Sequence, residues 1–275
     1  MTSTLLQEKN QRLLSILKEM EQVLVAFSGG VDSTFLLAKA KEALGDRVLA
    51  VTAASETFPT REFELAVSLA KQIGVTHIQT SVSELTNANF VKNESDRCFH
   101  CKDGLYTHVQ ELVEQYGASH TIVDGSNMDD LGEHRPGMQA ARERGVRSPL
   151  QEAGLYKEEI RLLSKEMGLP TWNKPSFACL SSRIPYGTKI TQEKIDQLDL
   201  AEMFLLNLGL YQVRVRHHDK IARIEVMPED MPKVLAHHEK IDRALKSYGF
   251  SYVTLDLQGY RSGSMNEVLK EALRK

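Results

Sequence analysis

The chain has 275 residues, and 41% of them are hydrophobic, which is enough for an apolar core in one large domain or two smaller ones. Its formal net charge of −3 provides no general basic field, which speaks against nucleic acid or an anionic membrane surface as a partner. Three cysteines without a secretion signal argue against a disulfide framework and indicate a reducing compartment, so we expect a cytoplasmic protein.

The first two-thirds of the chain alternates predicted strands and helices. After a short amphipathic N-terminal helix, which has neither the length nor the composition of a signal peptide or membrane span, strands are expected at 23–27, 48–53, 77–82 and 120–123. Helices are expected at 33–44, 60–73 and 102–116. This βαβα order predicts an α/β fold whose parallel sheet carries helices on both faces. Ligands of such sheets bind beyond the C-terminal strand ends.

The stretch V-L-V-A-F-S-G-G-V-D-S-T at residues 23–34 carries the strongest functional signal. Paired glycines between a strand and a helix let backbone N–H groups face an anion, and the helix N-terminus adds its positive end. The stretch therefore predicts a phosphate site, at Ser28, Gly29, Gly30, Asp32 and Ser33. Its spacing matches neither the Walker pattern nor the dinucleotide pattern. A strand–turn–helix joint whose glycines merely permit the turn is the alternative.

S-G-G-x-D-S resembles the loop of the PP-loop ATPases, which cleave ATP to AMP and pyrophosphate. In that family the aspartate, here Asp32, helps to hold Mg²⁺ on the phosphates. Two further strand ends are expected at the same edge of the sheet: Ser55 follows the second strand, and Gly125 and Asn127 follow the fourth. We expect Ser55 and Asn127 to border adenine and ribose, and ordinary turn chemistry is the alternative for both.

From about residue 190 the pattern changes. A helix is expected at 192–208, a hairpin at 211–217 and 220–226, a helix at 231–248 and a strand at 252–257. The order αββαβ predicts a smaller α+β domain, joined by a linker at 182–189. We therefore expect a PP-loop ATPase domain over residues 1–185, followed by a substrate-binding or oligomerisation domain over 186–275.

The cysteines form the second strong signal. Cys98 and Cys101 make C-F-H-C at the start of a predicted helix, and Cys179 lies far away in S-F-A-C-L-S-S-R. A C-x-x-C pair places two thiols on one side of a turn. Three interpretations are open: a dithiol with an unrelated core cysteine, a structural zinc site completed by a histidine, or a 4Fe–4S cluster on three thiolates.

Four segments occur together and in this order: S-G-G-V-D-S, D-G-S-N-M-D-D-L-G-E-H-R-P-G, S-P-L and K-P-S-F-A-C-L-S-S-R-I-P-Y-G. The set resembles the LarE family of ATP-dependent sulfur transferases, which build the nickel-pincer nucleotide cofactor. The resemblance extends into the C-terminal part, where V-R-V-R-H-H-D-K-I-A-R-I-E is also similar. S-G-G-x-D-S alone fits many PP-loop enzymes, and the later segments narrow the field.

The resemblance implies that a carboxylate of a pyridinium dicarboxylate mononucleotide is adenylated, with release of pyrophosphate, and that sulfur then displaces AMP to give a thiocarboxylate. One branch of the family takes this sulfur from a single cysteine of its own chain and leaves dehydroalanine. This chain departs from that branch by having C-F-H-C besides Cys179. It resembles the other branch, in which three cysteines, here Cys98, Cys101 and Cys179, hold a 4Fe–4S cluster whose open iron carries an extra sulfide.

The implied cofactors are ATP, Mg²⁺ and the 4Fe–4S cluster. The implied partners are a small-molecule nucleotide substrate, a sulfide donor and further copies of the chain, often in a hexamer. The substrate is anionic, so guanidinium groups should hold it. The family match assigns this role to Arg183, Arg214 and Arg216, with Ser182 as a neighbouring donor. Glu225 is a candidate metal or substrate ligand. Arg214 and Arg216 share one strand face by the period of two, and a solvated strand face is the alternative.

Three other functions remain open at this stage. A tRNA-thiolating enzyme shares the C-x-x-C pair with a distant cysteine, although the net charge of −3 speaks against a large polyanion. An amidating synthetase of the NAD synthetase type needs an ammonia source and gives no reason for three cysteines. A non-enzymatic nucleotide-binding module with structural zinc predicts colourless protein without ATP turnover.

Overall fold

The computed structural model describes residues 4–115, 120–132, 136–261 and 263–264. They form two compact units: unit 1 comprises the residues up to 83 together with 98–177, and unit 2 comprises 84–97 together with those from 178 onward. This division differs from the domains expected at 1–185 and 186–275. The reason lies in backbone hydrogen bonds inside unit 2, where the carbonyls of Asn93 and Val91 accept from the N–H groups of Gly187 and Ile190.

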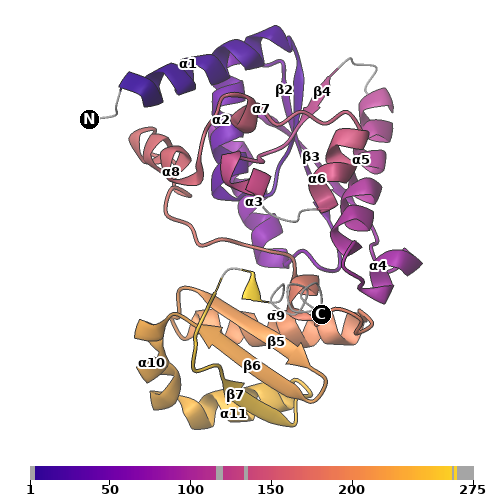
Figure 1. Cartoon of the computed structure of the whole chain (residues 1–275), viewed down its shortest axis with the longest axis vertical. Coiled ribbons are helices and arrows are strands. Elements are labelled where there is room, and N and C mark those ends of the chain that lie inside the picture. The colour runs from indigo at the N-terminus through magenta and orange to yellow at the C-terminus, as the bar shows by residue number, and fades with distance from the viewer. Residues whose placement is uncertain (1–3, 116–119, 133–135, 262, 265–275) are drawn as a thin grey trace. The chain divides into compact units, whose positions relative to one another are not determined.

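Unit 1 contains a four-stranded sheet in the order β3-β2-β1-β4 (Figure 1). Every neighbouring pair is parallel, as predicted. The strands are β1 (Val23–Ala26), β2 (Val48–Ala54), β3 (Thr76–Ser81) and β4 (Thr121–Val123). Because β1 lies between β2 and β4, the loop that follows β1 emerges beside the loop that follows β4.

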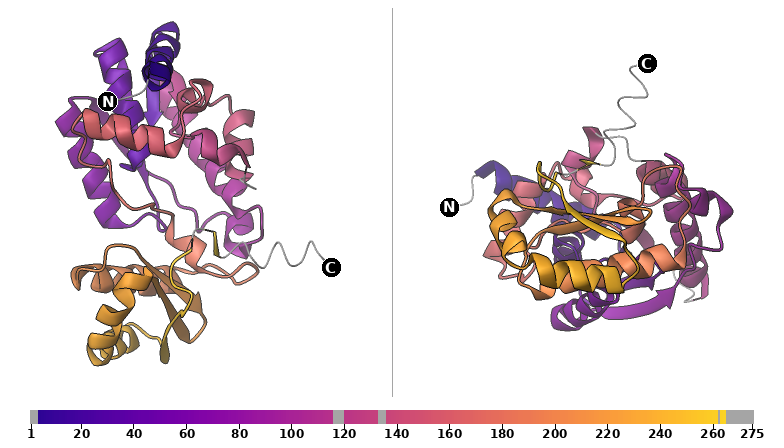
Figure 2. Two further views of the ribbon diagram at one scale, coloured as in Figure 1. Left: turned by 60° about the vertical axis from the view of Figure 1, so that its left-hand side comes forward. Right: turned by 90° about the horizontal axis from the view of Figure 1, so that it is seen from below.

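Helices cover both faces of this sheet, which confirms the α/β prediction (Figure 1, Figure 2). One face packs against α1 (Thr4–Glu19), α2 (Val31–Leu44), α3 (Thr60–Ile73), α7 (Pro149–Glu152) and α8 (Lys157–Glu166). The other packs against α5 (Arg97–Gln115) and α6 (Pro136–Glu143). The sequence pattern did not predict α6, α7 or α8. The expected C-terminal end of the helix at 102–116 lies outside the described residues.

Unit 2 contains a mixed sheet in the order β5-β6-β7, in which β5 and β6 are antiparallel and β6 and β7 parallel. Helix α9 packs against β5 and α11. The elements are α4 (Ala88–Lys92), α9 (Gln192–Asn207), β5 (Val213–His218), β6 (Ile221–Val226), α10 (Met231–Ala236), α11 (His238–Ser247) and β7 (Tyr252–Leu255). The single helix expected at 231–248 is two helices, because His237 leaves the helical conformation at φ −109° and ψ 17°. The expected α+β character is confirmed.

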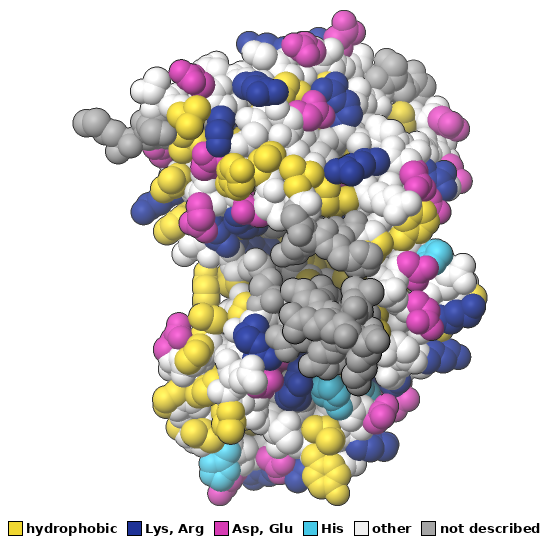
Figure 3. Space-filling model, in the orientation of Figure 1, with side chains coloured by type: hydrophobic (Ala, Val, Ile, Leu, Met, Phe, Trp, Pro, Cys, Tyr) yellow, Lys and Arg dark blue, Asp and Glu magenta, His cyan; other side chains and the backbone are white. Residues whose placement is uncertain are grey.

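The surface agrees with the mixed charge of the sequence. On the face shown in Figure 3, Lys and Arg side chains are interspersed with Asp and Glu. Among the described helices, none combines the length and apolarity needed to cross a membrane.

Candidate functional site

The loop between β1 and α2 has the geometry of an anion site. Gly29 adopts φ +67°, and a Cβ there would come within 3.2 Å of Ala66, so both conformation and space favour glycine. Helix α2 begins after Gly30 without a side-chain cap. The hydroxyls of Ser28 and Ser33 lie 3.1 Å apart across the loop. Uncapped N–H groups at a helix N-terminus are donors that an anion can accept from.

The end of β4 approaches this loop very closely. A Cβ on Gly125 would come within 2.9 Å of the backbone nitrogen of Ser33, so only glycine permits this approach. The Asn127 side-chain amide then donates to Asp32 Oδ1 at 3.3 Å. The predicted residues at the ends of β1 and β4 are thus brought together. Part of the D-G-S-N-M-D-D-L-G-E-H-R-P-G segment, residues 133–135, lies outside the described residues.

Two lysines that the sequence interpretation missed reach the same loop. Lys157, at the start of α8, donates to Asp32 Oδ2. Lys174 donates to the Gly29 carbonyl at 3.0 Å and to Glu62 Oε2 at 2.6 Å. The Walker pattern supplies its lysine beside the glycines, whereas here the cations come from more than a hundred residues further along the chain. Lys174 is the first residue of the K-P-S-F-A-C-L segment, which carries part of the family resemblance. That segment is the sequence signal that could have indicated a role for Lys174.

Ser55 lies elsewhere on the same edge of the sheet. It follows β2 and lines a pocket of about 320 Å³ at the C-terminal ends of β2 and β3, together with Ala54, Glu56, Ser81, Val82 and Ser83. Its carbonyl accepts from the N–H of Phe58 at 3.1 Å, which is the turn chemistry considered as the alternative. The adenine role of Ser55 stays a prediction.

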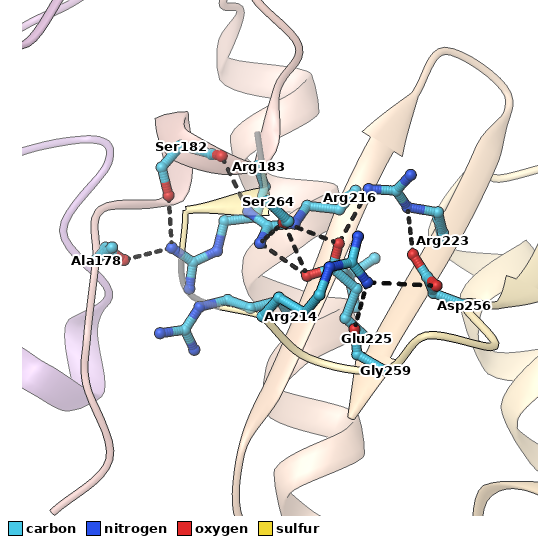
Figure 4. Close-up of polar contacts among 12 residues, drawn as sticks. Ala178, Ser182, Arg183, Arg214, Arg216, Arg223, Glu225, Asp256, Gly259 and Ser264 are labelled. Carbon is cyan, nitrogen blue, oxygen red and sulfur yellow. Dashed lines mark hydrogen bonds and ion pairs between the residues drawn. The ribbon is translucent and has the colours of Figure 1, made fainter. Parts of the chain in front are cut away.

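In unit 2 the predicted arginines of β5, Arg214 and Arg216, lie on one polar face of the sheet (Figure 4). Arg214 pairs with Glu225 across β5 and β6, and Arg216 pairs with Arg223. Glu225 is fully buried, and it accepts from Arg216 at 2.7 Å and from Arg223 at 3.0 Å. Because both β5 arginines are buried, the alternative of a solvated strand face does not apply to them.

Arg214 lies in surroundings that destabilise its charged form. Burial, followed by the positive charge of Arg183, lowers the pKa of Arg214 to about 10. Its guanidinium lies 5.4 Å from the centre of the Tyr260 ring, a cation–π distance. A buried guanidinium beside a second one is electrostatically receptive to an added anion.

Arg183 is fully buried and makes its hydrogen bonds within the protein. Its Nε and Nη2 donate to the two oxygens of Glu202 at 2.9 and 3.0 Å, and Nη1 donates to Ser182 Oγ at 2.9 Å. Burial acts to raise the pKa of Glu202, but the charges of Arg183 and Arg214 and the hydrogen bonds from Arg183 and Val215 together hold that pKa below its usual value. The Ser182 carbonyl accepts from Arg216 at 3.1 Å. Arg183 thus joins the arginines of β5 as part of one network.

All three cysteines are reduced thiols, and each is partly exposed. Cys98 and Cys101 lie in the first turns of α5 in unit 1, one helical turn apart and on one side of it. Cys179 belongs to unit 2, at the start of a 3₁₀ turn over Leu180–Arg183. Within the described residues, no group of three His, Cys, Asp or Glu side chains forms a metal site.

The parallel sheet and its glycine loop define a PP-loop protein that uses ATP. The family model "NAD synthase" matches residues 8–112, which carry this loop. GMP synthase of Aliarcobacter butzleri is 29% identical over 54% of this chain and 32% of its own length.

Two relatives match almost the whole chain. The pyridinium-3,5-bisthiocarboxylic acid mononucleotide synthase of Lactiplantibacillus plantarum is 41% identical over 96% of both chains. An uncharacterized protein of Synechocystis is 42% identical over 96% of this chain and 99% of its own. The chain therefore belongs to the LarE family, that of the mononucleotide synthase.

Proposed function

We propose that the protein is an ATP-dependent sulfur transferase of nickel-pincer cofactor synthesis. It adenylates a carboxylate of a pyridinium dicarboxylate mononucleotide, releases pyrophosphate, and replaces AMP with sulfur to give a thiocarboxylate. The observation that carries this proposal is the match to the mononucleotide synthase over 96% of both chains. The glycine loop between β1 and α2 supports the ATP half of the reaction independently.

In the first step a carboxylate oxygen of the substrate attacks the α-phosphorus of ATP, and the bond to pyrophosphate breaks. The N–H groups of the loop, Lys157 and Lys174 supply the positive charge that the leaving pyrophosphate needs. Asp32 is the carboxylate that would hold Mg²⁺, which neutralises phosphate charge when bound. Its position in the first turn of α2, beside the loop, fits that role.

In the second step sulfur attacks the acyl carbon, and the bond to the AMP oxygen breaks. We propose Cys98, Cys101 and Cys179 as ligands of a 4Fe–4S cluster, because thiolates are the usual ligands and this sequence offers three and no fourth. When bound, a cluster with one iron free of protein ligands supplies an exchangeable sulfide. The spacing of Cys98 and Cys101 in one helical turn fits a shared ligand role.

The buried arginines of β5 are the proposed holders of the substrate phosphate. Arg214 and Arg216 share the face, and Glu225 and Ser264 fix the Arg216 guanidinium at 2.7 and 2.9 Å. Glu225 would therefore act by orienting an arginine as well as by contacting substrate. Ser182 is the proposed neighbouring donor. A homo-oligomer, a sulfide donor and a cytoplasmic location complete the proposal.

Product analysis tests the reaction class. With ATP, Mg²⁺, the dicarboxylate mononucleotide and a source of sulfide, we expect AMP and pyrophosphate in equal amounts. Formation of ADP and orthophosphate would refute the PP-loop chemistry. A second candidate, amidation, is favoured by the NAD synthase match of residues 8–112. It predicts an amide product when ammonia replaces sulfide.

Anaerobic purification tests the cofactor. The proposal expects brown protein with iron and acid-labile sulfide, and unchanged cysteines after turnover. Dehydroalanine at position 179 after a single turnover would show instead that the chain spends its own cysteine sulfur.

A further inference from the structure

The turn that carries Cys179 is held in place by its backbone. Cys179 precedes the 3₁₀ turn Leu180–Arg183, whose Leu180 and Ser181 are buried. The Ser181 hydroxyl donates to the Cys179 sulfur at 3.3 Å. A partly exposed thiol therefore stands on a buried turn, and the position of its sulfur depends on how that turn is fixed.

Arg183 binds this turn from one side. Its Nη1 donates to the carbonyls of Ala178 and Cys179 at 2.6 and 3.0 Å. The other edge of the guanidinium is anchored by the buried Glu202, which also accepts from the N–H of Val215 at 3.0 Å. The carbonyls on both sides of the Cys179 α-carbon are thus tied, through Arg183 and Glu202, to strand β5.

Arg97 binds the same turn through a third carbonyl. It is only 4% exposed, and its Nη1 donates to the Ser181 carbonyl at 3.0 Å and to Asn93 Oδ1. Asn93 is fully buried, and its amide donates to the carbonyls of Pro185 and Thr188 at 2.8 and 2.9 Å. All these residues belong to unit 2, and Arg97 directly precedes Cys98 in the chain.

The turn is held by two buried guanidinium groups, those of Arg97 and Arg183. Burying a charge costs free energy that hydrogen bonds only partly return, so such groups are weak evidence for stability alone. Their planar donors do fix the direction of the carbonyls they bind. We propose that Arg97 and Arg183 are positioning residues for sulfur transfer, which fix the Cys179 turn through three of its backbone carbonyls, those of Ala178, Cys179 and Ser181. This inference rests on the proposed function and assigns Arg183 to the turn instead of the substrate.

The experiment compares Arg97→Met, Arg97→Lys and Asn93→Ala with the wild-type chain. Arg144→Lys is the matched control. Arg144 also donates a hydrogen bond to another side chain, that of Asp103 at 2.7 Å, but Asp103 lies on α5 of unit 1 and not on the Cys179 turn. Three quantities are measured: alkylation of Cys179 by iodoacetamide in cluster-free protein, pyrophosphate release in a single turnover with the dicarboxylate mononucleotide and no sulfide, and thiocarboxylate formation by the protein purified anaerobically.

We expect Arg97→Met to alkylate Cys179 faster and to lose about tenfold in thiocarboxylate formation, the order expected for one charge-assisted hydrogen bond. Its pyrophosphate release should stay within about twofold of wild type, since ATP activation uses unit 1 residues. Arg97→Lys, which keeps the charge, should recover part of the loss, and Arg144→Lys should match wild type. If Arg97→Met does not fold, Arg97→Lys and Asn93→Ala carry the test.

Wild-type alkylation and thiocarboxylate formation in these variants would overturn the inference. So would equal losses in thiocarboxylate formation and pyrophosphate release, because a general structural role lowers both. If the wild type releases no pyrophosphate, the proposed function fails instead. Cys179 alkylation then still decides whether Arg97 fixes the turn.

Discussion

Substitution of Arg214 is a demanding test, because it should raise the stability of the folded protein while lowering its affinity for the substrate. A pKa of about 10 against the ordinary 12.5 means that the charge costs about 3 kcal/mol in the folded unit. Arg214→Met keeps the apolar stem and removes that cost. It also loses the cation–π contact with Tyr260 and the hydrogen bond from Nη1 to the Val213 carbonyl at 2.8 Å, each worth about 1 kcal/mol. We therefore expect a gain of about 1 kcal/mol in the free energy of unfolding and a Tm higher by a few degrees.

The same substitution removes a proposed phosphate contact. Its loss should weaken substrate binding by about 2 kcal/mol, or about thirtyfold in Kd. Affinity for ATP should be unchanged, because β5 belongs to unit 2. Thermal unfolding and titration calorimetry with each ligand measure these effects, with Lys220→Met at the exposed hairpin turn as the control. A less stable Arg214→Met, or equal losses for ATP and substrate, would refute the reasoning.

Three further predictions concern unit 1 and the packing of unit 2. Gly125→Ala should raise the KM for ATP strongly, because its Cβ would meet the Ser33 nitrogen at 2.9 Å. Gly104→Ala is the control and should leave the KM unchanged, because a Cβ at Gly104 has open space; the same KM for both variants would contradict the close approach at Gly125. Asp32→Asn should reduce AMP and pyrophosphate formation sharply, and Mg²⁺ titration should show weaker activation; a wild-type Mg²⁺ response would remove Asp32 from the metal site. Burial lowers the pKa of His217 to about 4 from 6.5. Between pH 6.5 and pH 4 this histidine therefore binds a proton in the unfolded chain but not in the folded unit. Stability should fall as the pH falls from 6.5 to 4, and less so in His217→Asn; an NMR titration of His217 with a midpoint near 6.5 would contradict this.

The sequence alone predicted the nucleotide half of the fold well. Apolar strands that alternate with helices imply parallel neighbours, and the C-terminal ends of those neighbours must meet at one edge. The meeting of Asp32 with Asn127 followed from that logic. Lys157 and Lys174 did not, because a single lysine at the start of a helix or in a loop has no periodic signature.

Unit 2 shows what such patterns cannot reveal. Residues 84–97 join it through the side chain of Asn93, a long-range contact that no local propensity encodes. Residue type alone also cannot separate an arginine that binds substrate from one that Glu202 already holds. The family resemblance implies a substrate role for Arg183, and that role stays a prediction; the structure adds hydrogen bonds from Arg183 to the Cys179 turn and Glu202, which the sequence did not indicate.

The proposed protein transfers sulfur catalytically to an activated carboxylate. The most direct measurement is mass spectrometry of the mononucleotide after anaerobic incubation of the cluster-containing protein with ATP, Mg²⁺ and excess sulfide. The account predicts a product in which sulfur replaces a carboxylate oxygen, in several equivalents per chain, with one AMP for each sulfur transferred. An unchanged carboxylate alongside AMP formation, or product limited to one equivalent with Cys179 converted to dehydroalanine, would contradict it.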